Sequence, residues 1–201
     1  MAYLRLGFAI AVSLLLFAVP ALAADQSSAP TPAFYDRPVL VIDPGMHTNQ
    51  IWSAAADVEG RWAVTGSDDK TARVWSLPDG ALVRTIRLPA GPGNVGKANS
   101  VAMSPDGALI AVGGWTRQTS ADPQEQIYLF DRASGALRRR IEGVSLPALR
   151  LTFSTDGRLL AAMTGDKGLR IYAGDRDWAE VARDTHYSWA STALPSRLTE
   201  G

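Results

Sequence analysis

The sequence predicts an all-β fold built from repeated antiparallel units of four strands, and the spacing of its turns supports this prediction. Short apolar segments alternate with turns that contain Gly, Asp or Pro, the residues that tight turns favour for steric reasons. Three turn glycines, at positions 60, 107 and 157, lie 47 and 50 residues apart. In each unit an aromatic residue closes the third strand: Trp75, Phe130 or Tyr172. This period indicates a repeat architecture rather than a meander sandwich.

Composition excludes several classes of site. The chain has 201 residues, enough for one domain, and 46% of them are hydrophobic, enough for a packed core. Acidic and basic residues balance at 20 each, so net charge does not favour nucleic acid. There is no cysteine for a disulfide or a thiolate site, and two histidines are too few for a His-rich metal cluster. We therefore expect no metal, no cofactor and no nucleic-acid partner.

The first 23 residues have the pattern of a secretory signal peptide. Arg5 precedes an apolar run from Leu6 to Val19, and Ala21-Leu22-Ala23 follows as a small-residue cleavage pattern. The alternative, a retained membrane anchor, is disfavoured because the run is shorter than the roughly 20 residues that span a bilayer. We expect cleavage after Ala23, a linker at 24–37, and a periplasmic or secreted protein with no stable membrane insertion.

The first repeated unit resembles one blade of a WD40 β-propeller. Repeats of that family carry a G-H pair and a W-D pair about 40 residues apart. Here the G-H pair is loosened to Gly45-Met46-His47, and the W-D pair is Trp75-Ser76. These motifs specify an architecture rather than a reaction. Together with the N-terminal leader, the resemblance implies a WD40-repeat protein of the bacterial exported type.

The resemblance implies a partial WD40-type β-propeller with three four-stranded blades and an N-terminal closing strand. The repeats would occupy residues 38–184, and the apolar run at 39–43 lies where a ring-closing strand is found in the family. The expected blades are approximately residues 46–88, 97–143 and 147–184. Because closed propellers have about four to eight blades, we expect the N-terminal part of a larger propeller, followed by an irregular tail at 185–201.

By the family pattern, four residues of the first blade form a hydrogen-bonded structural tetrad: His47, Thr65, Asp69 and Trp75. A buried indole N–H needs an acceptor, which the threonine hydroxyl can supply. A nucleophilic His-Asp-Thr triad is the alternative. The structural interpretation is favoured because buried polar networks specify one packing, and no residue is predicted to be catalytic. The third blade has Ala162 at the position of Thr65, so it must rely on apolar packing.

Two long loops of the second blade, at 89–99 and 115–126, should lie at the same end of the blade, because alternate connections of a meander share one end. We expect this end to bind a protein partner, since Trp and Arg dominate interface hot spots. The candidate residues are Asn94, Lys97, Asn99, Trp115, Arg117 and Gln118. The alternative is that Trp115 packs back on its own blade.

These observations favour a non-catalytic protein-interaction scaffold of unknown partner, as part of a larger propeller or a regulatory module. Open blade edges would allow self-association. A propeller enzyme, such as a lactonase or a quinone-dependent dehydrogenase, is the first alternative, and the scarcity of His and of paired acids counts against it. A non-functional truncated remnant is the second.

Overall fold

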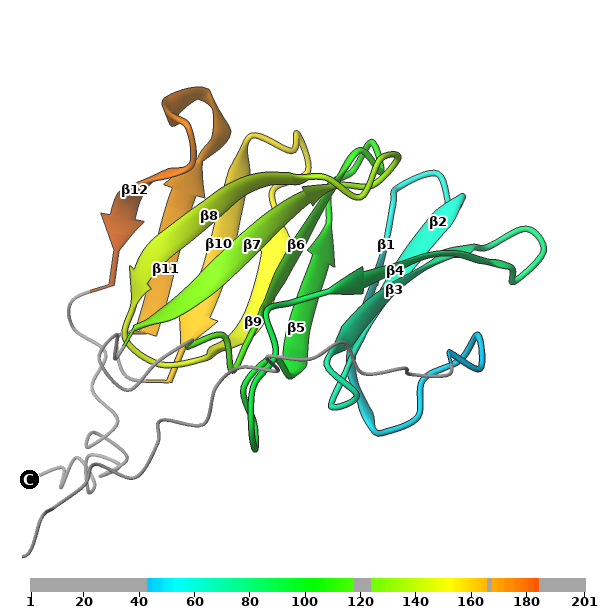
Figure 1. The fold of residues 1–201 in the computed structure, drawn as a ribbon. Coiled ribbons are helices and arrows are strands. Elements are labelled where there is room, and N and C mark those ends of the chain that lie inside the picture. Colours follow the sequence, from blue (N-terminus) through cyan, green and yellow to red (C-terminus); the bar gives the residue numbers. More distant parts are fainter. Residues whose placement is uncertain (1–42, 118–123, 166–167, 185–201) are drawn as a thin grey trace, which may run out of the picture. The chain divides into compact units, whose positions relative to one another are not determined.

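The computed structural model describes residues 43–117, 124–165 and 168–184, which form three four-stranded antiparallel sheets (Figure 1). The first sheet contains β1 (Ile51–Ala56), β2 (Trp62–Ser67), β3 (Thr71–Ser76) and β4 (Leu82–Arg87). The second contains β5 (Ala98–Met103), β6 (Leu109–Gly114), β7 (Glu125–Asp131) and β8 (Leu137–Val144). The third contains β9 (Ala148–Phe153), β10 (Leu159–Thr164), β11 (Gly168–Ala173) and β12 (Ala179–Arg183). A short 3-10 helix, η1 (Gly174–Arg176), joins β11 to β12.

In each sheet the strands pair in chain order, as in an up-and-down blade. The first strands lie innermost, with β1 packed beside β5 and β5 beside β9. The all-β prediction and the prediction of three four-stranded blades are therefore confirmed. We refer to the sheets below as blades one, two and three.

The turn between the first two strands has the same design in blades two and three. Ser104 Oγ donates to Asp106 Oδ1 at 2.5 Å, and that carboxylate oxygen also accepts the N–H of Ala108 at 3.0 Å. Ser154 and Asp156 repeat the first of these bonds at 2.5 Å. These acids shape turns by bonding their own backbone, so their chemistry is structural.

Two apolar cores join the blades. Between blades one and two, Val64 and Val74 pack with Val101, Val112 and Phe130. Between blades two and three, the core contains Leu129, Ile141, Leu151, Leu160 and Tyr172. Alternate residues of a strand point to opposite faces, so the middle blade contributes one face to each core. Burial between neighbours is what stabilises a repeat fold.

Two glycines at equivalent positions of β2 and β6 let neighbouring blades approach closely. A Cβ added at Gly66 would lie 2.6 Å from the carbonyl oxygen of Ala98 and 2.8 Å from Val101 Cγ1. At Gly113 it would lie 2.9 Å from the Cβ of Ala148. Both contacts are too short for any side chain, so the inner strands pack against bare backbone at these points.

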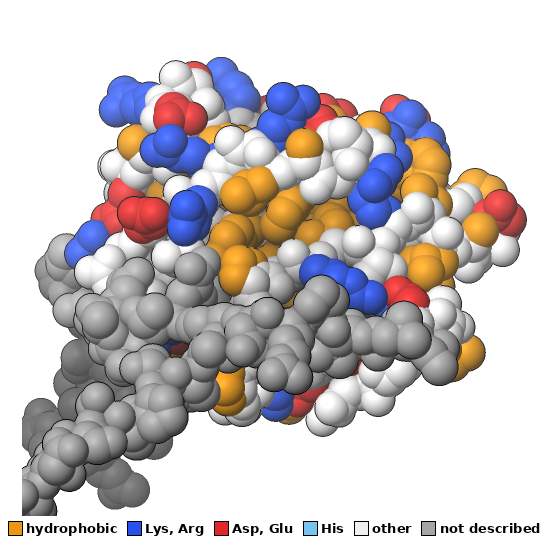
Figure 2. Space-filling model, viewed as in Figure 1, with side chains coloured by type: hydrophobic (Ala, Val, Ile, Leu, Met, Phe, Trp, Pro, Cys, Tyr) orange, Lys and Arg blue, Asp and Glu red, His pale blue; other side chains and the backbone are white. Residues whose placement is uncertain are grey.

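The face of blade three that points away from blade two is apolar and exposed. Leu159, Met163 and Leu169 are 40%, 51% and 40% exposed, and they alternate with residues buried against blade two. An exposed apolar surface of this kind is suited to further packing. Elsewhere on the molecule, Figure 2 shows hydrophobic side chains gathered near the middle of the viewed face, in the area where Figure 1 labels β6 and β7, with Lys and Arg side chains around them.

Several predictions fall outside the described residues. They are the signal peptide at 1–23, the linker at 24–37, the closing strand up to residue 42, Gln118, and the tail at 185–201. Asp43, the first described residue, does not belong to a strand. Within the described ranges, no helix has the length and apolarity that crossing a membrane requires.

Candidate interaction site and the networks that shape it

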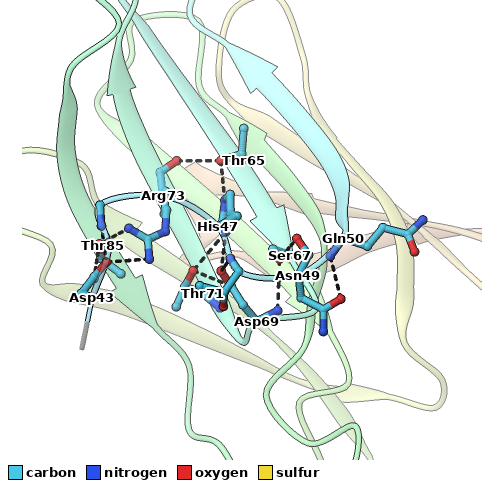
Figure 3. A network of polar contacts seen from close by, with 12 residues as sticks. Asp43, His47, Asn49, Gln50, Thr65, Ser67, Asp69, Thr71, Arg73 and Thr85 are labelled. Carbon is cyan, nitrogen blue, oxygen red and sulfur yellow. Dashed lines mark hydrogen bonds and ion pairs between the residues drawn. The ribbon is translucent and has the colours of Figure 1, made fainter. Parts of the chain in front are cut away.

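The four residues of the predicted tetrad lie together on blade one, and Figure 3 labels three of them, His47, Thr65 and Asp69. His47 Nδ1 is 2.8 Å from Asp69 Oδ2, and His47 Nε2 is 2.8 Å from Thr65 Oγ1. The indole N–H of Trp75 donates to the same Thr65 oxygen at 2.8 Å. Because an ionised carboxylate can only accept, the proton on Nδ1 belongs to the imidazole. The chain of contacts therefore runs from the carboxylate through imidazole and hydroxyl to the indole.

The tetrad is closed to solvent at its acidic end. The side chains of His47 and Asp69 are 3% and 5% exposed. Burial alone would raise the pKa of Asp69, but hydrogen bonds from Thr71 and His47 outweigh it and hold the pKa below its ordinary value. Thr71 Oγ1 donates to Asp69 Oδ1 at 2.6 Å. A half-buried hydroxyl that already accepts an indole N–H is poorly placed to attack a substrate, so the geometry favours a structural network.

An ion pair that the sequence motifs did not indicate lies beside the tetrad (Figure 3). The Arg73 side chain is 3% exposed, and its guanidinium lies 2.9 Å from Asp43 Oδ1. Hydrogen bonding from Arg73 lowers the pKa of Asp43. Asp43 comes from the segment before β1, and Arg73 from β3. The pair therefore helps to hold residues 43–48 against blade one, and only three-dimensional proximity reveals it.

The two long loops of blade two meet at one end of the blade. The N–H of Gly96 donates to Trp115 O at 2.6 Å, and the N–H of Trp115 donates to Lys97 O at 3.1 Å. Lys97 precedes β5, and Trp115 follows β6. This backbone pairing fixes the start of the second loop, and it presents the Trp115 side chain with 40% of its surface exposed.

Asp68, in the β2–β3 turn of blade one, ties the first loop to the neighbouring blade. Its carboxylate receives Lys97 Nζ at 2.9 Å and Asn99 Nδ2 at 3.3 Å. Burial would raise the pKa of Asp68, but hydrogen bonds from Lys97, Trp52 and Asn99 and the charge of Lys97 together outweigh it, and the pKa lies below its ordinary value. Lys97 and Asn99 are thus engaged within the chain. They position the loop, with Lys97 Nζ and Asn99 Nδ2 committed to Asp68.

Glu125 organises the start of the second loop, although the sequence patterns gave it no role. It is 4% exposed, and its Oε2 accepts the N–H groups of Thr116, at 2.5 Å, and Arg117, at 2.7 Å. Thr116 Oγ1 donates to the same oxygen at 3.1 Å and lies 2.8 Å from the carbonyl of Gln126. No sequence motif marks Thr116 and Glu125, so only their burial in the folded chain distinguishes them.

An apolar groove lies at the loop end of the inner strands, with a volume of about 740 Å³. We call it the inner-strand groove. Each blade contributes to it: Trp52 from blade one, Asn99 and Trp115 from blade two, and Leu146, Leu149 and Gly165 from blade three. Trp52 and Leu149 are 54% and 60% exposed. Of the predicted partner residues, the structure therefore brings Asn99 and Trp115 together in one groove.

The remaining predicted partner residues have other surroundings. Asn94 is exposed in the first loop, and its carbonyl accepts the N–H of Lys97 at 3.0 Å. Arg117 is exposed, with its backbone N–H held by Glu125. Neither lines the inner-strand groove. Among residues 43–117, 124–165 and 168–184, no cluster of three or more His, Cys, Asp or Glu side chains could hold a metal ion.

Comparison with known proteins identifies the repeat. Residues 40–76 match the WD domain, G-beta repeat, over the segment that holds the tetrad. The solved structure of U3-55K superposes with a TM-score of 0.58, at 17% identity, over 71% of this chain and 41% of that chain. This chain carries a WD40 repeat in a propeller-like all-β fold. With three four-stranded blades among the described residues, the fold is a partial WD40-type β-propeller.

Curated relatives match over shorter stretches. The ribosome biogenesis protein BOP1 homolog of Monosiga brevicollis is 31% identical over 93 residues, which is 45% of this chain and 11% of the relative. The homolog from Aedes aegypti is 36% identical over 80 residues, 39% of this chain and 8% of the relative. The chain thus spans about a tenth of the length of these relatives.

These relatives correct the predicted location. A periplasmic or secreted protein of bacterial exported type was expected from the N-terminal pattern, and that prediction is wrong on this comparison. The matching proteins are ribosome biogenesis proteins from organisms that have no periplasm. The error arose because an apolar run followed by small residues has a simple composition, whereas the match to the relatives rests on extended sequence identity.

Proposed function

We propose that this chain is a non-catalytic protein-interaction scaffold of the WD40-repeat type, and that the inner-strand groove is its principal partner surface. The observation that carries the proposal is the pair of exposed tryptophans, Trp52 and Trp115, in one apolar groove. Monomeric proteins rarely expose large apolar side chains together without a binding role. The WD domain match and the ribosome biogenesis relatives support a scaffold over an enzyme.

The hydrogen bonds that hold the two long loops also support the inner-strand groove as the partner surface. Asp68 holds Lys97 and Asn99, and Glu125 holds Thr116 and the backbone of Arg117. Both acids therefore preorganise the loops around Trp115 before a partner arrives. Preorganisation lowers the entropic cost of binding. We assign Lys97 to loop positioning, Trp115 to the contact itself, and the exposed Asn94 and Arg117 to the rim.

The scaffold is tested by comparing the proteins retained by the purified wild-type chain with those retained by a Trp52→Ala/Trp115→Ala variant. The matched control is Val83→Ala/Leu137→Ala, which removes exposed apolar side chains from outer strands β4 and β8. We expect a stoichiometric partner that the groove variant loses and the control keeps. No stoichiometric partner, or turnover of a lactone or an alcohol by the purified chain, would contradict the proposal.

We also propose that the exposed apolar face of blade three packs against a further blade or against a second copy of the chain. Leu159, Met163 and Leu169 expose an apolar surface of the kind that blades two and one bury against each other. We expect self-association at high protein concentration, measured by light scattering. Met163→Glu should reduce it, because the acid replaces an apolar contact with an ion that would have to be desolvated.

The absence of a nucleic-acid partner stays a prediction. The net charge of zero supports it, whereas the similarity to ribosome biogenesis proteins makes RNA the relevant probe. We expect no salt-dependent change in the anisotropy of a labelled RNA oligonucleotide when the chain is added. Binding that weakens steeply with salt would overturn the prediction, because phosphate contacts release counterions.

A further inference from the structure

We propose that the exposed apolar face of blade three, which contains Leu159, Met163 and Leu169, binds the same face of a second copy of this chain in a symmetric dimer. We call it the free face of blade three. The inference rests on the proposed function, because it selects one occupant for a face already proposed to pack. Two features lead to it: large side chains that a further blade would meet, and charges that are complementary under a two-fold rotation.

Blade three differs from the other two blades at the point where neighbouring blades approach most closely. In blades one and two, a glycine pairs with a serine at this point: Gly66 with Ser53, and Gly113 with Ser100. A Cβ on either glycine would lie within 3.0 Å of the next blade. The equivalent pair in blade three is Met163 with Arg150, and both are exposed. A further blade cannot pack here in the same way, because two large side chains occupy the space.

One row of the free face carries opposite charges at its two ends. Residues directly opposite each other in a sheet lie on the same face, and Met163 pairs with Arg150 on β9 and with Leu169 on β11. Asp184 follows β12, and its N–H donates to Leu169 O at 2.8 Å, which places it beside Leu169. Strand β9 lies at the inner edge of the blade and β12 at the outer edge (Figure 1). The row therefore has a cation at its inner end, an acid at its outer end and two apolar side chains between them.

A two-fold axis parallel to the strands makes this row complementary to itself. Rotation about an axis over the middle of the row places the second copy's Leu169 opposite Met163. It also places the second copy's Asp184 opposite Arg150, and symmetry repeats this ion pair at the other end of the row. Only the sign of the charge at each end matters, whatever else these side chains contact within their own chain.

The next row of the free face is complementary in size under the same rotation. Ala161 pairs with Ile171, and both are half-buried. The rotation places the second copy's Ile171 opposite Ala161, so a large side chain meets a small one on both sides of the axis. Two sheets that pack face to face, about 10 Å apart, interdigitate their side chains in this manner.

The size of the free face predicts a weak, reversible dimer. Three strand spacings of about 4.8 Å and six residues of about 3.3 Å each give a face of roughly 14 by 20 Å. Two such faces cover roughly 600 Å² before side-chain relief is counted, which is below the roughly 1,200 Å² of stable interfaces. We therefore expect monomers in dilute solution and dimers at high protein concentration.

Charge reversal in the full-length chain tests the pairing by sedimentation equilibrium. Arg150→Asp and Asp184→Arg should each weaken dimerisation by at least about tenfold, because each substitution places like charges opposite one another at two symmetric sites. The double variant restores opposite charges and should dimerise within about threefold of the wild type. The matched control is Arg176→Asp, which makes the same charge change in η1 at the other end of β11 and should leave dimerisation unchanged.

Recovery of the dimer in the double variant supports the proposal. A wild type that stays monomeric up to about 1 mM would overturn it, and so would a mass that grows beyond the dimer, which indicates head-to-tail assembly. A dimer that neither single variant weakens, or that the double variant does not restore, would overturn it as well. If Met163→Glu still reduces that association, the face packs but not in this register.

The test is independent of the partner surface, because these variants leave Trp52 and Trp115 of the inner-strand groove unchanged. Loss of this dimer model with a groove partner still retained removes only the present inference. A charge-dependent dimer without any groove partner removes only the proposed scaffold function.

Discussion

The aromatic residue that closes the third strand has different surroundings in blade one and in blades two and three. The pairing register makes the positions equivalent: Trp75 pairs with Ala63, Phe130 with Ile110, and Tyr172 with Leu160. Trp75 is fixed by a hydrogen bond to Thr65, within a polar network. Phe130 and Tyr172 lie in the apolar cores between blades, 7% and 2% exposed.

The difference follows from what each position faces. In blades two and three the closing aromatic points toward the preceding blade, and apolar packing holds it. In blade one the same face meets residues 43–48, through His47 and Asp43. An apolar core needs a broad apolar surface opposite. A short segment offers little such surface, whereas a chain of directional hydrogen bonds needs only well-placed polar groups. The tetrad therefore secures the blade that has no described neighbour on that side.

The largest expected effect comes from Trp75→Ala, which tests the hydrogen-bonded aromatic residue of blade one. We expect a loss of about 3–5 kcal/mol in the free energy of unfolding. The substitution removes a large side chain and leaves Thr65 without its indole partner. Urea unfolding measures the effect. Trp115→Ala serves as the control, with an expected change within about 0.5 kcal/mol because Trp115 is 40% exposed. Equal effects at the two positions would contradict the packing of blade one.

The two interfaces between blades are compared by Gly66→Ala and Gly113→Ala. We expect Gly66→Ala to cost about 3 kcal/mol, since its Cβ would meet the Ala98 carbonyl at 2.6 Å and backbone cannot move away easily. Gly113→Ala should cost less, about 2 kcal/mol, because its Cβ would make one contact under 3.0 Å, with the Ala148 methyl at 2.9 Å, whereas Gly66 makes two. Denaturation midpoints rank the two variants. The reverse order would mean that blades two and three are the more tightly joined pair.

The polar network of blade two is tested by Glu125→Ala, which strands the N–H groups of Thr116 and Arg117. Buried donors left unpaired cost about 1–3 kcal/mol, so we expect a loss of about 2 kcal/mol in thermal or urea unfolding. Glu125→Gln is the matched variant, because its amide oxygen can accept the same hydrogens, and it should cost less than half as much. A Gln variant as unstable as the Ala variant would show that the negative charge matters more than the acceptor.

The sequence patterns predicted the blades well and the contacts between them poorly. Turn chemistry at Gly60, Gly107 and Gly157 marks where strands begin, because such turns have few alternatives. The tetrad residues were found because a repeat signature places them. Glu125 and Asp68 carry no such signature, and their roles depend on which loops fold onto which turn. The groove combines residues from three blades, and no local pattern in the chain encodes that proximity.

The smallest expected effect is a difference in how stability depends on pH, and it separates the tetrad from the neighbouring Asp43–Arg73 ion pair. The pKa of Asp69 is lowered in the folded chain, so its contribution to stability is present above the unfolded pKa of about 3.9 and is lost as pH falls through the folded value. Unfolding free energy measured from about pH 5 down to pH 3 should therefore fall less steeply in Asp69→Asn than in the wild type. The difference is small because Asp43, Asp57 and Asp68, whose pKa values are also lowered, titrate in the same window. Asp43→Asn is the matched variant: it removes an acid from the same end of blade one but leaves the tetrad intact. If both variants flatten the curve equally, the tetrad contributes no more than the ion pair between Asp43 and Arg73.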